Sequence, residues 1–262
     1  MGRVLRFLVT AILLINFSYI NCQTIKPTFK IGEKLNYDIY YNWGLIWIKA
    51  GEFTSSVSLK KLGNNQFYWF DLKGKSLKSH DWIYKFNDHI QGYADMESFK
   101  PYWAENNMFN DGSQYYENYT IDGSKGRIYS ITKSDKFPLK KDTLKYTNSF
   151  FDIAGASYYL RSIDYSHIKP NEKITFSVIS DNEFHPLYLR YLGKEQVILH
   201  NNSVYNCLKL KLLVIKGDVF DGGEAITVWI TNDENHIPVQ FEAKILVGAI
   251  KVYIVEAENA SK

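Results

Sequence analysis

Apolar and polar side chains alternate along most of this chain. In residues 34–43, Leu, Tyr and Ile positions are separated by Asn, Asp and Tyr positions, and similar runs recur up to residue 258. A period of two is typical of a β-strand with one buried face. The pattern therefore predicts a mainly β protein.

Turn residues between these runs indicate how the strands are connected. Asp111-Gly112 and Asp122-Gly123 each separate two alternating runs, and both residue types tolerate the positive φ of a tight hairpin turn. After residue 172, further runs follow with short polar turns between them. Such connections require antiparallel pairing, and the sheet must curl, close or be covered to protect its edges. We predict an antiparallel curved sheet or incomplete barrel.

One segment, residues 149–166, favours a helix. Asp152 can cap it, and its apolar positions recur at helical spacing. They are Ile153, Ala156, Tyr159, Leu160 and Ile163. Residues 79–92 fit either a strand or a short helix. We predict one β-rich domain over residues 23–262, with two sub-lobes joined near 149–166 as an alternative.

The N-terminus has the order of a secretory signal peptide. Arg3 and Arg6 precede the apolar run 7–15, and more polar residues follow. That run is too short to cross a bilayer core of about 30 Å. We predict a signal peptide over residues 1–22 and export to the periplasm or outer membrane.

The two cysteines allow two further interpretations. Cys22 could be the acylated cysteine of a lipoprotein, although residues 19–21 do not match the small residues expected before it. Once the signal peptide is removed, Cys207 is the one cysteine left, so no intramolecular disulfide is expected. We interpret Cys207 as a small, partly buried residue and not as a nucleophile, since the sequence places no base near it.

The overall composition narrows the class of protein. Apolar residues make up 45% of the chain and charged residues 23%, as in an ordinary globular protein. The net charge is only +3, with Lys dispersed, so we expect no nucleic-acid partner. Aromatic residues reach 16%. These side chains suit a pleated sheet before they indicate any ligand.

A group of acidic and imidazole side chains lies near the C-terminus, with Asp233, Glu234, His236 and Glu242 close together. Four turn-forming residues in a row precede His236, and their short side chains bond readily to the local backbone. Pro238 then removes one ladder donor, which favours an edge position or a bulge. We predict a turn here, with no metal and no cofactor.

An enzyme would need a convergent set of catalytic groups. The sequence contains no nucleophile elbow, zinc-protease helix or phosphate loop. The segment with His80, Asp81, Asp88 and His89 is the most plausible catalytic or metal site, although a solvated aromatic loop explains it better. Paired carboxylates are also possible, but no pair is specified, so the catalytic residues stay unknown. The carboxylates considered are Asp71, Asp81, Asp88, Glu117, Asp122, Glu183 and Glu242.

Three segments, in order, resemble a known family. They are FKIGEKLNYDIYYNWGLIWIKAG, DIAGASYYLRSID and VWITNDENHIPVQFEAKILVGAIKVYI. Their most specific positions are Trp229–Thr231, Asp233, Pro238-Val239 and Val247-Gly248. The family is an uncharacterised one of exported Gram-negative proteins, a domain of unknown function numbered 3108, and the composition resembles a member from the Bacteroidetes. The resemblance implies export and a largely β fold, without any known chemistry.

A second resemblance covers the last third of the chain. The Trp-initiated strand, Asp-containing turn, Pro-bearing strand and Gly turn are similar to those of half-barrel carriers of lipids and lipoproteins in the bacterial envelope. Independently of this resemblance, a curved sheet of this length can enclose more space than its own side chains fill, so we expect a cavity.

These observations favour a non-catalytic envelope protein over an enzyme. The expected ligand is apolar or amphipathic, namely a lipid, a lipoprotein or a glycan, and peripheral membrane association is possible. The alternatives are a glycan-active hydrolase or lyase, and a structural or assembly protein without a small ligand. The oligomeric state is open. Candidate ligand-binding residues are Tyr37, Tyr41, Trp47, Trp69, Trp82 and Trp103.

Overall fold

The structure, a computed structural model, describes residues 26–43, 46–82, 84–214, 222–245 and 248–260. The predicted signal peptide and Cys22 lie outside these residues. No helix within the described ranges is both long and apolar enough to span a membrane.

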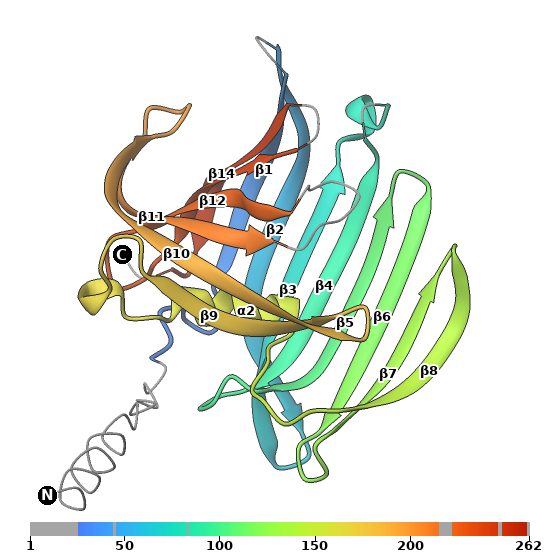
Figure 1. The fold of residues 1–262 in the computed structure, drawn as a ribbon. Coiled ribbons are helices and arrows are strands. Elements are labelled where there is room, and N and C mark those ends of the chain that lie inside the picture. Colours follow the sequence, from blue (N-terminus) through green and yellow to red (C-terminus); the bar gives the residue numbers. More distant parts are fainter. Residues whose placement is uncertain (1–25, 44–45, 83, 215–221, 246–247, 261–262) are drawn as a thin grey trace, which may run out of the picture.

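The described residues form one antiparallel sheet of fourteen strands (Figure 1). The strands are β1 (Lys34–Trp43), β2 (Ile46–Leu62), β3 (Asn65–Ser76), β4 (Phe86–Asp95), β5 (Pro101–Asn110), β6 (Ser113–Asp122), β7 (Arg127–Ser134), β8 (Phe137–Lys145), β9 (Lys173–Ser180), β10 (Glu183–Ile198), β11 (Val204–Val214), β12 (Gly223–Thr231), β13 (Pro238–Lys244) and β14 (Ala249–Glu258). The predicted mainly β fold is confirmed.

Two consecutive meanders, β1–β8 and β9–β14, build this sheet. They join through β1 and β14, which pair antiparallel with Tyr37 opposite Ile254 and Ile39 opposite Val252. The sheet ends at β8 on one side and β9 on the other. Because these two edges do not pair within the described residues, the curved sheet is an incomplete barrel, as predicted.

One α-helix, α2 (Ile153–Arg161), links the two meanders and lies within the curve of the sheet beside β3, β4 and β9 (Figure 1). The side chain of Asp152 accepts a hydrogen bond from the Gly155 N–H at 2.9 Å, which confirms the predicted cap. Gly92 on β4 lets the helix approach, since a Cβ there would lie 2.5 Å from the Asp152 carboxylate. The helix is thus seated directly on the sheet.

The helix is shorter than the predicted segment 149–166. Phe151 is extended and forms a parallel bridge with Val178 of β9, so its backbone pairs with the sheet instead of starting the helix. After Arg161 the chain leaves the helix and makes a single 3₁₀ turn, η2 (Tyr165–His167). The buried positions of the helix also differ from the predicted face, because Tyr158 stacks on Phe70 of β3 and Arg161 binds Glu33, which precedes β1. The buried helical residues are Ala154, Gly155, Ala156, Tyr158 and Arg161.

Aromatic side chains fix the helix against β3. The rings of Phe70 and Tyr158 stack with centroids 4.2 Å apart, and Phe29 packs edge-on against both. Aromatic pairs of this kind add about 0.5–1.5 kcal/mol each beyond the burial of their area. Part of the aromatic excess therefore serves to hold the helix in the sheet.

Only one of the two Asp-Gly pairs forms the two-residue hairpin turn predicted from the sequence. Asp111 and Gly112 both have positive φ, 47° and 89°, and form the predicted two-residue hairpin. Asp122-Gly123 instead begins a longer turn over residues 123–126. The ambiguous segment 79–92 starts within a 3₁₀ turn, η1 (Lys78–His80), and its residues from Phe86 onward form part of β4.

The helix cap makes stability depend on pH. Asp152 is buried, one of its carboxylate oxygens has no hydrogen-bond partner among the described atoms, and burial raises its pKa to about 6 from 3.8. A carboxyl whose pKa is raised by folding favours the folded state at low pH, and this contribution is lost as the pH rises through about 6.

We therefore expect Asp152→Asn, which keeps a capping side chain, to remove this dependence. Urea unfolding of both proteins at about pH 4.5 and about pH 8 should show their stability difference changing by about 2 kcal/mol, with the wild type relatively more stable at the lower pH. If the stability difference between the two proteins were the same at both pH values, Asp152 would not be the source of the pH dependence.

Candidate ligand-binding cavity

A cavity of about 370 Å³ lies on the concave side of the sheet, between α2 and the strands around the β1–β14 junction. Its lining is mostly aliphatic and aromatic. The residues from the strands include Leu35, Ile39, Phe53, Leu72, Leu189, Leu210, Leu212, Ile226, Val228, Ile230, Phe241, Ala243, Ile250 and Val252, and the helix contributes Ser157, Tyr158, Leu160 and Arg161.

Period-two alternation places these side chains in tiers. Residues that face each other on neighbouring strands of an antiparallel sheet point to the same side. One tier, across β11 to β14, consists of Leu212, Ile226, Ala243 and Ile250. The next tier consists of Leu210, Val228, Phe241, Val252 and, on β1, Ile39.

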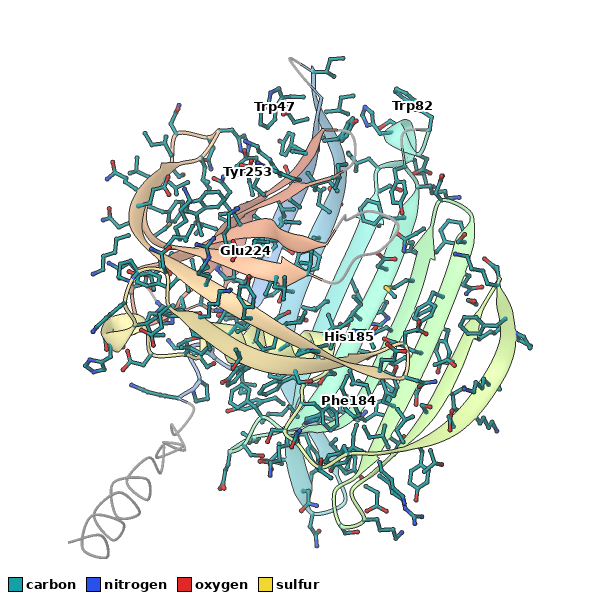
Figure 2. The ribbon with its side chains drawn as sticks, viewed as in Figure 1. Trp47, Trp82, Phe184, His185, Glu224 and Tyr253 are labelled. Atoms are coloured by element: carbon teal, nitrogen blue, oxygen red, sulfur yellow. The ribbon has the colours of Figure 1, made fainter. Side chains whose placement is uncertain are left out.

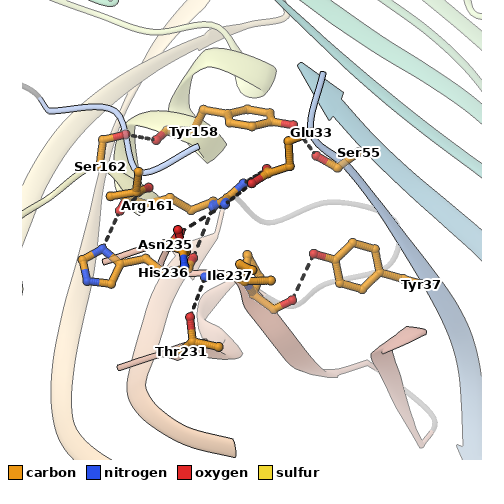
Figure 3. A network of polar contacts seen from close by, with 12 residues as sticks. Glu33, Tyr37, Ser55, Tyr158, Arg161, Ser162, Thr231, Asn235, His236 and Ile237 are labelled. Atoms are coloured by element: carbon orange, nitrogen blue, oxygen red, sulfur yellow. Dashed lines mark hydrogen bonds and ion pairs between the residues drawn. The ribbon is translucent and has the colours of Figure 1, made fainter. Parts of the chain in front are cut away.

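A buried ion pair forms the floor of the cavity (Figure 3). Arg161 donates from its two terminal nitrogens to the two Glu33 carboxylate oxygens at 2.7 and 3.1 Å. Its Nε donates to the His236 carbonyl at 3.2 Å, and its Nη2 also donates to the Asn235 carbonyl at 3.2 Å. Burial opposes the charge of Arg161, but the hydrogen bond and negative charge of Glu33 raise the pKa of Arg161. The guanidinium is therefore neutralised within the protein.

The hydroxyl groups beside this pair are also satisfied. Ser55 Oγ and the Tyr158 hydroxyl share a hydrogen bond of 2.7 Å, and the Tyr37 hydroxyl donates to the Pro238 carbonyl at 3.0 Å. Burial raises the pKa of both tyrosines. The polar groups of the floor thus form hydrogen bonds and an ion pair with one another. The space above them is lined by apolar side chains.

We infer that the cavity opens toward the outer tier. All residues of the outer tier except Ala243 are partly exposed, whereas in the inner tier Leu210 and Val228 are buried and Ile39, Phe241 and Val252 are partly exposed. This outer end carries the connections β1–β2, β3–β4, β11–β12 and β13–β14. We call it the mouth end.

A family model covers nearly all of this architecture. The model of DUF3108, a family described as proteins of unknown function, matches residues 36–255, from β1 to β14. The chain belongs to the DUF3108 family. The predicted family resemblance is thereby confirmed. No curated protein sequence matches the chain significantly.

A solved structure shares the DUF3108 fold. The crystal structure of a beta-barrel-like protein of a domain of unknown function, DUF1849, from Brucella abortus superposes with a TM-score of 0.55. The alignment covers 88% of this chain and 98% of that one, at 10% sequence identity. At this identity the similarity establishes the fold alone.

Of the six aromatic residues predicted to bind ligand, one lines the cavity of this DUF3108 protein. Tyr37 lies at the floor. Tyr41 is opposite Ile250, beside the outer tier. Trp47 and Trp82 are 50% and 78% exposed at the mouth end (Figure 2).

The remaining two, Trp69 and Trp103, face away from the cavity. Phe70 points toward the helix, so its neighbour Trp69 points to the convex face. There Tyr93 lies between the two indoles, stacking on Trp103 at 4.6 Å and meeting Trp69 edge-on at 6.0 Å. The structure thus divides the six among the cavity, its mouth end and the convex face.

Of the acidic and imidazole group near the C-terminus, Asp233, Glu234 and His236 lie in a turn, whereas Glu242 lies on β13 and forms an ion pair with Lys251 at 3.2 Å. Asp233 accepts hydrogen bonds from Thr231 Oγ1 at 2.7 Å and from the Asn235 N–H at 2.9 Å. The ladder is irregular where Pro238 meets Ile230, which confirms the predicted bulge. His236 contacts the Arg161 carbonyl through Nδ1 at 2.7 Å, and burial lowers its pKa. This turn supports the cavity floor.

Other candidate catalytic groups have separate structural partners. His89 bonds to Asp71 at 2.6 Å, whereas Asp88 accepts from the Phe109 N–H, and His80 contacts Ser79. Cys207 is buried, and burial raises the pKa of its thiol to about 11. Within the described residues, no group of three or more His, Cys, Asp or Glu side chains could hold a metal ion.

Proposed function

We propose that this protein is a non-catalytic, exported binding protein of the bacterial envelope that holds an apolar or amphipathic ligand in its half-barrel. The observation that carries the proposal is the apolar cavity above an internally paired floor. Its volume of about 370 Å³ lies in the usual range for small-ligand sites, about 300–1,000 Å³.

The lining favours a hydrocarbon chain over a glycan. Sugar hydroxyls placed against Val228, Phe241 and Val252 would lose their hydrogen bonds to water without replacement, which costs about 1–3 kcal/mol per group. Since Arg161 is already held by Glu33, an anionic head group gains no free cation at the floor. A lipid or lipoprotein acyl chain would therefore enter tail first and leave its head at the mouth end. The similarity of the last strands to half-barrel lipid carriers supports the same ligand class.

Filling the cavity should block binding. Val252 on β14 faces the cavity, and we expect Val252→Phe to weaken binding of a fluorescent fatty acid by about tenfold, because overpacking such a site typically costs about 1–3 kcal/mol. The measurement is a fluorescence titration, with native mass spectrometry of protein recovered from an envelope extract to detect a co-purified lipid.

A matched control lies on the same strand. Val255 is 57% exposed on the opposite face of β14, so Val255→Phe should leave binding unchanged. Thermal melting of both variants checks that they fold. Failure of the wild type to bind the probe, together with no co-purifying lipid, would rule out the carrier function.

A further inference from the structure

Exposed apolar side chains gather at the mouth end of the sheet. Trp82 lies in the connection between β3 and β4, and Trp47 lies in the β1–β2 hairpin, one residue beyond the pair formed by Tyr41 and Ile48. Figure 2 shows both indoles at the same end of the molecule. The mouth rim, as defined here, consists of Ile46, Trp47, Trp82 and Tyr84 together with Lys78, Lys85 and Lys244.

The position of this rim relates it to the cavity. Ser76, the last residue of β3, is opposite Gly51, and Gly51 is opposite Ile39 of the cavity lining. The β3–β4 connection, which carries Trp82, therefore starts beside the strand positions that line the cavity and extends beyond them at the mouth end. Large apolar side chains exposed at such a place commonly mark a contact surface.

The charges of the rim favour an anionic surface. Within the described part of the chain, no carboxylate lies within 4.0 Å of the ammonium groups of Lys78, Lys85 or Lys244, whereas Lys49 and Lys251 nearby are paired with acidic side chains. Lys85 lies over the ring of Phe109, 5.5 Å from its centroid, so it is held by an aromatic side chain and not by an acidic one. Indole and phenol rings beside lysines that have no carboxylate partner are typical of proteins at the interface between lipid head groups and hydrocarbon. Lysines near a bilayer are attracted to its anionic lipids.

We propose that the mouth rim docks on the surface of an anionic lipid bilayer. Trp82 and Trp47 would insert between head groups, while the three lysines contact lipid phosphates. The choice of a bilayer as partner rests in part on the proposed function, because docking here would bring the cavity mouth to the membrane. An acyl chain could then pass between bilayer and cavity with little exposure to water.

Vesicle binding tests this docking. The probe is a vesicle of phosphatidylethanolamine and phosphatidylglycerol, with brominated chains to quench tryptophan fluorescence. The full chain is used, and since every variant keeps residues 1–25, differences between variants report on the rim. We expect wild-type fluorescence to be quenched, and Trp82→Ala to remove most of the quenching and weaken binding about tenfold.

The lysines supply a second, salt-dependent readout. Lys78→Gln and Lys85→Gln should each weaken binding by about fivefold at low salt, and by less at high salt. Matched controls lie on the edge strand β8, where Leu139→Ala and Lys141→Gln change exposed residues outside the rim. These controls should bind vesicles as the wild type does.

Three results would overturn the docking proposal. The first is that Trp82→Ala binds vesicles, and is quenched by them, as the wild type is. The second is that the β8 controls lose as much binding as the rim variants. The third is that the wild type forms a concentration-dependent dimer and does not bind vesicles, and that Trp82→Ala abolishes this dimer. Fatty-acid binding in solution, without vesicles, separates the two proposals. It should persist in Trp82→Ala and be lost in Val252→Phe, so either proposal can fail while the other stands.

Discussion

Replacing Arg161 with methionine is expected to lower the free energy of unfolding by about 3–5 kcal/mol, the usual cost of removing one partner from a buried ion pair. The substitution leaves the Glu33 carboxylate buried without its cation. It also removes the donors to the carbonyls of Asn235 and His236. Urea unfolding followed by circular dichroism measures the loss.

A double-mutant cycle separates the ion pair from the rest of the network. Glu33→Leu alone should be similarly costly, because it leaves the Arg161 guanidinium buried without its anion. The double variant should lose less than the sum of the two single losses, since it buries neither charge unpaired. Additive losses would mean that the two side chains do not depend on each other.

The expected size of this effect reflects how many segments meet at Arg161. Glu33 precedes β1, Arg161 ends α2, and Asn235 and His236 belong to the turn between β12 and β13. One side chain therefore ties the helix to both meanders. The same contacts close the bottom of the cavity, so the shape of the proposed site and the stability of the fold depend on a single group.

Much of the sheet was predictable from alternation alone. The period-two runs identify most strands, and the Asp111-Gly112 pair identifies a hairpin, because both features depend on local chain geometry. Pairing of β1 with β14 was not predictable, since it joins residues more than two hundred positions apart. The helix start was misplaced because Phe150 and Phe151 have apolar side chains that suit a strand edge as well as a helix.

The sequence predicted that a cavity exists but did not predict which residues line it. Aromatic residue type does not reveal which face of a strand a side chain occupies. Trp69 and Phe70 are neighbours, and only the position of α2 decides that Phe70 lies on the concave face. The Glu33–Arg161 pair has no local signal either, because its members are 128 residues apart.

Because the two edge strands of the sheet do not pair, other contacts must hold the two meanders together at these edges. β8 and β9 do not pair, yet the tip of the β9–β10 hairpin contacts the inner face of the opposite meander. Glu117 on β6 is fully buried and accepts hydrogen bonds from the Asp181 N–H at 2.8 Å and from Ser180 Oγ at 3.2 Å. The neighbouring Tyr119 hydroxyl accepts from the Asn182 N–H at 3.0 Å. A side-chain network thus replaces the missing strand pairing.

Glu117→Ala is therefore expected to lower the free energy of unfolding by about 3–4 kcal/mol, because several buried donors lose their acceptor at about 1–3 kcal/mol each. The Tyr115 and Tyr119 hydroxyls, each 2.8 Å from the carboxylate, are among these donors. Urea unfolding measures the loss, and amide hydrogen exchange should show faster exchange of the Asp181 N–H.

Glu105 on β5 supplies a matched control. Its carboxylate also accepts from side-chain donors, including the Tyr116 hydroxyl at 2.9 Å and Asn118 at 3.1 Å, but it is only partly buried and contacts neither β9 nor β10 through these bonds. Water can replace its hydrogen bonds, so Glu105→Ala should cost about 1 kcal/mol or less and leave exchange at Asp181 unchanged. Equal losses for the two alanine variants, or unchanged exchange in Glu117→Ala, would show that the hairpin is held by apolar packing and not by the buried carboxylate.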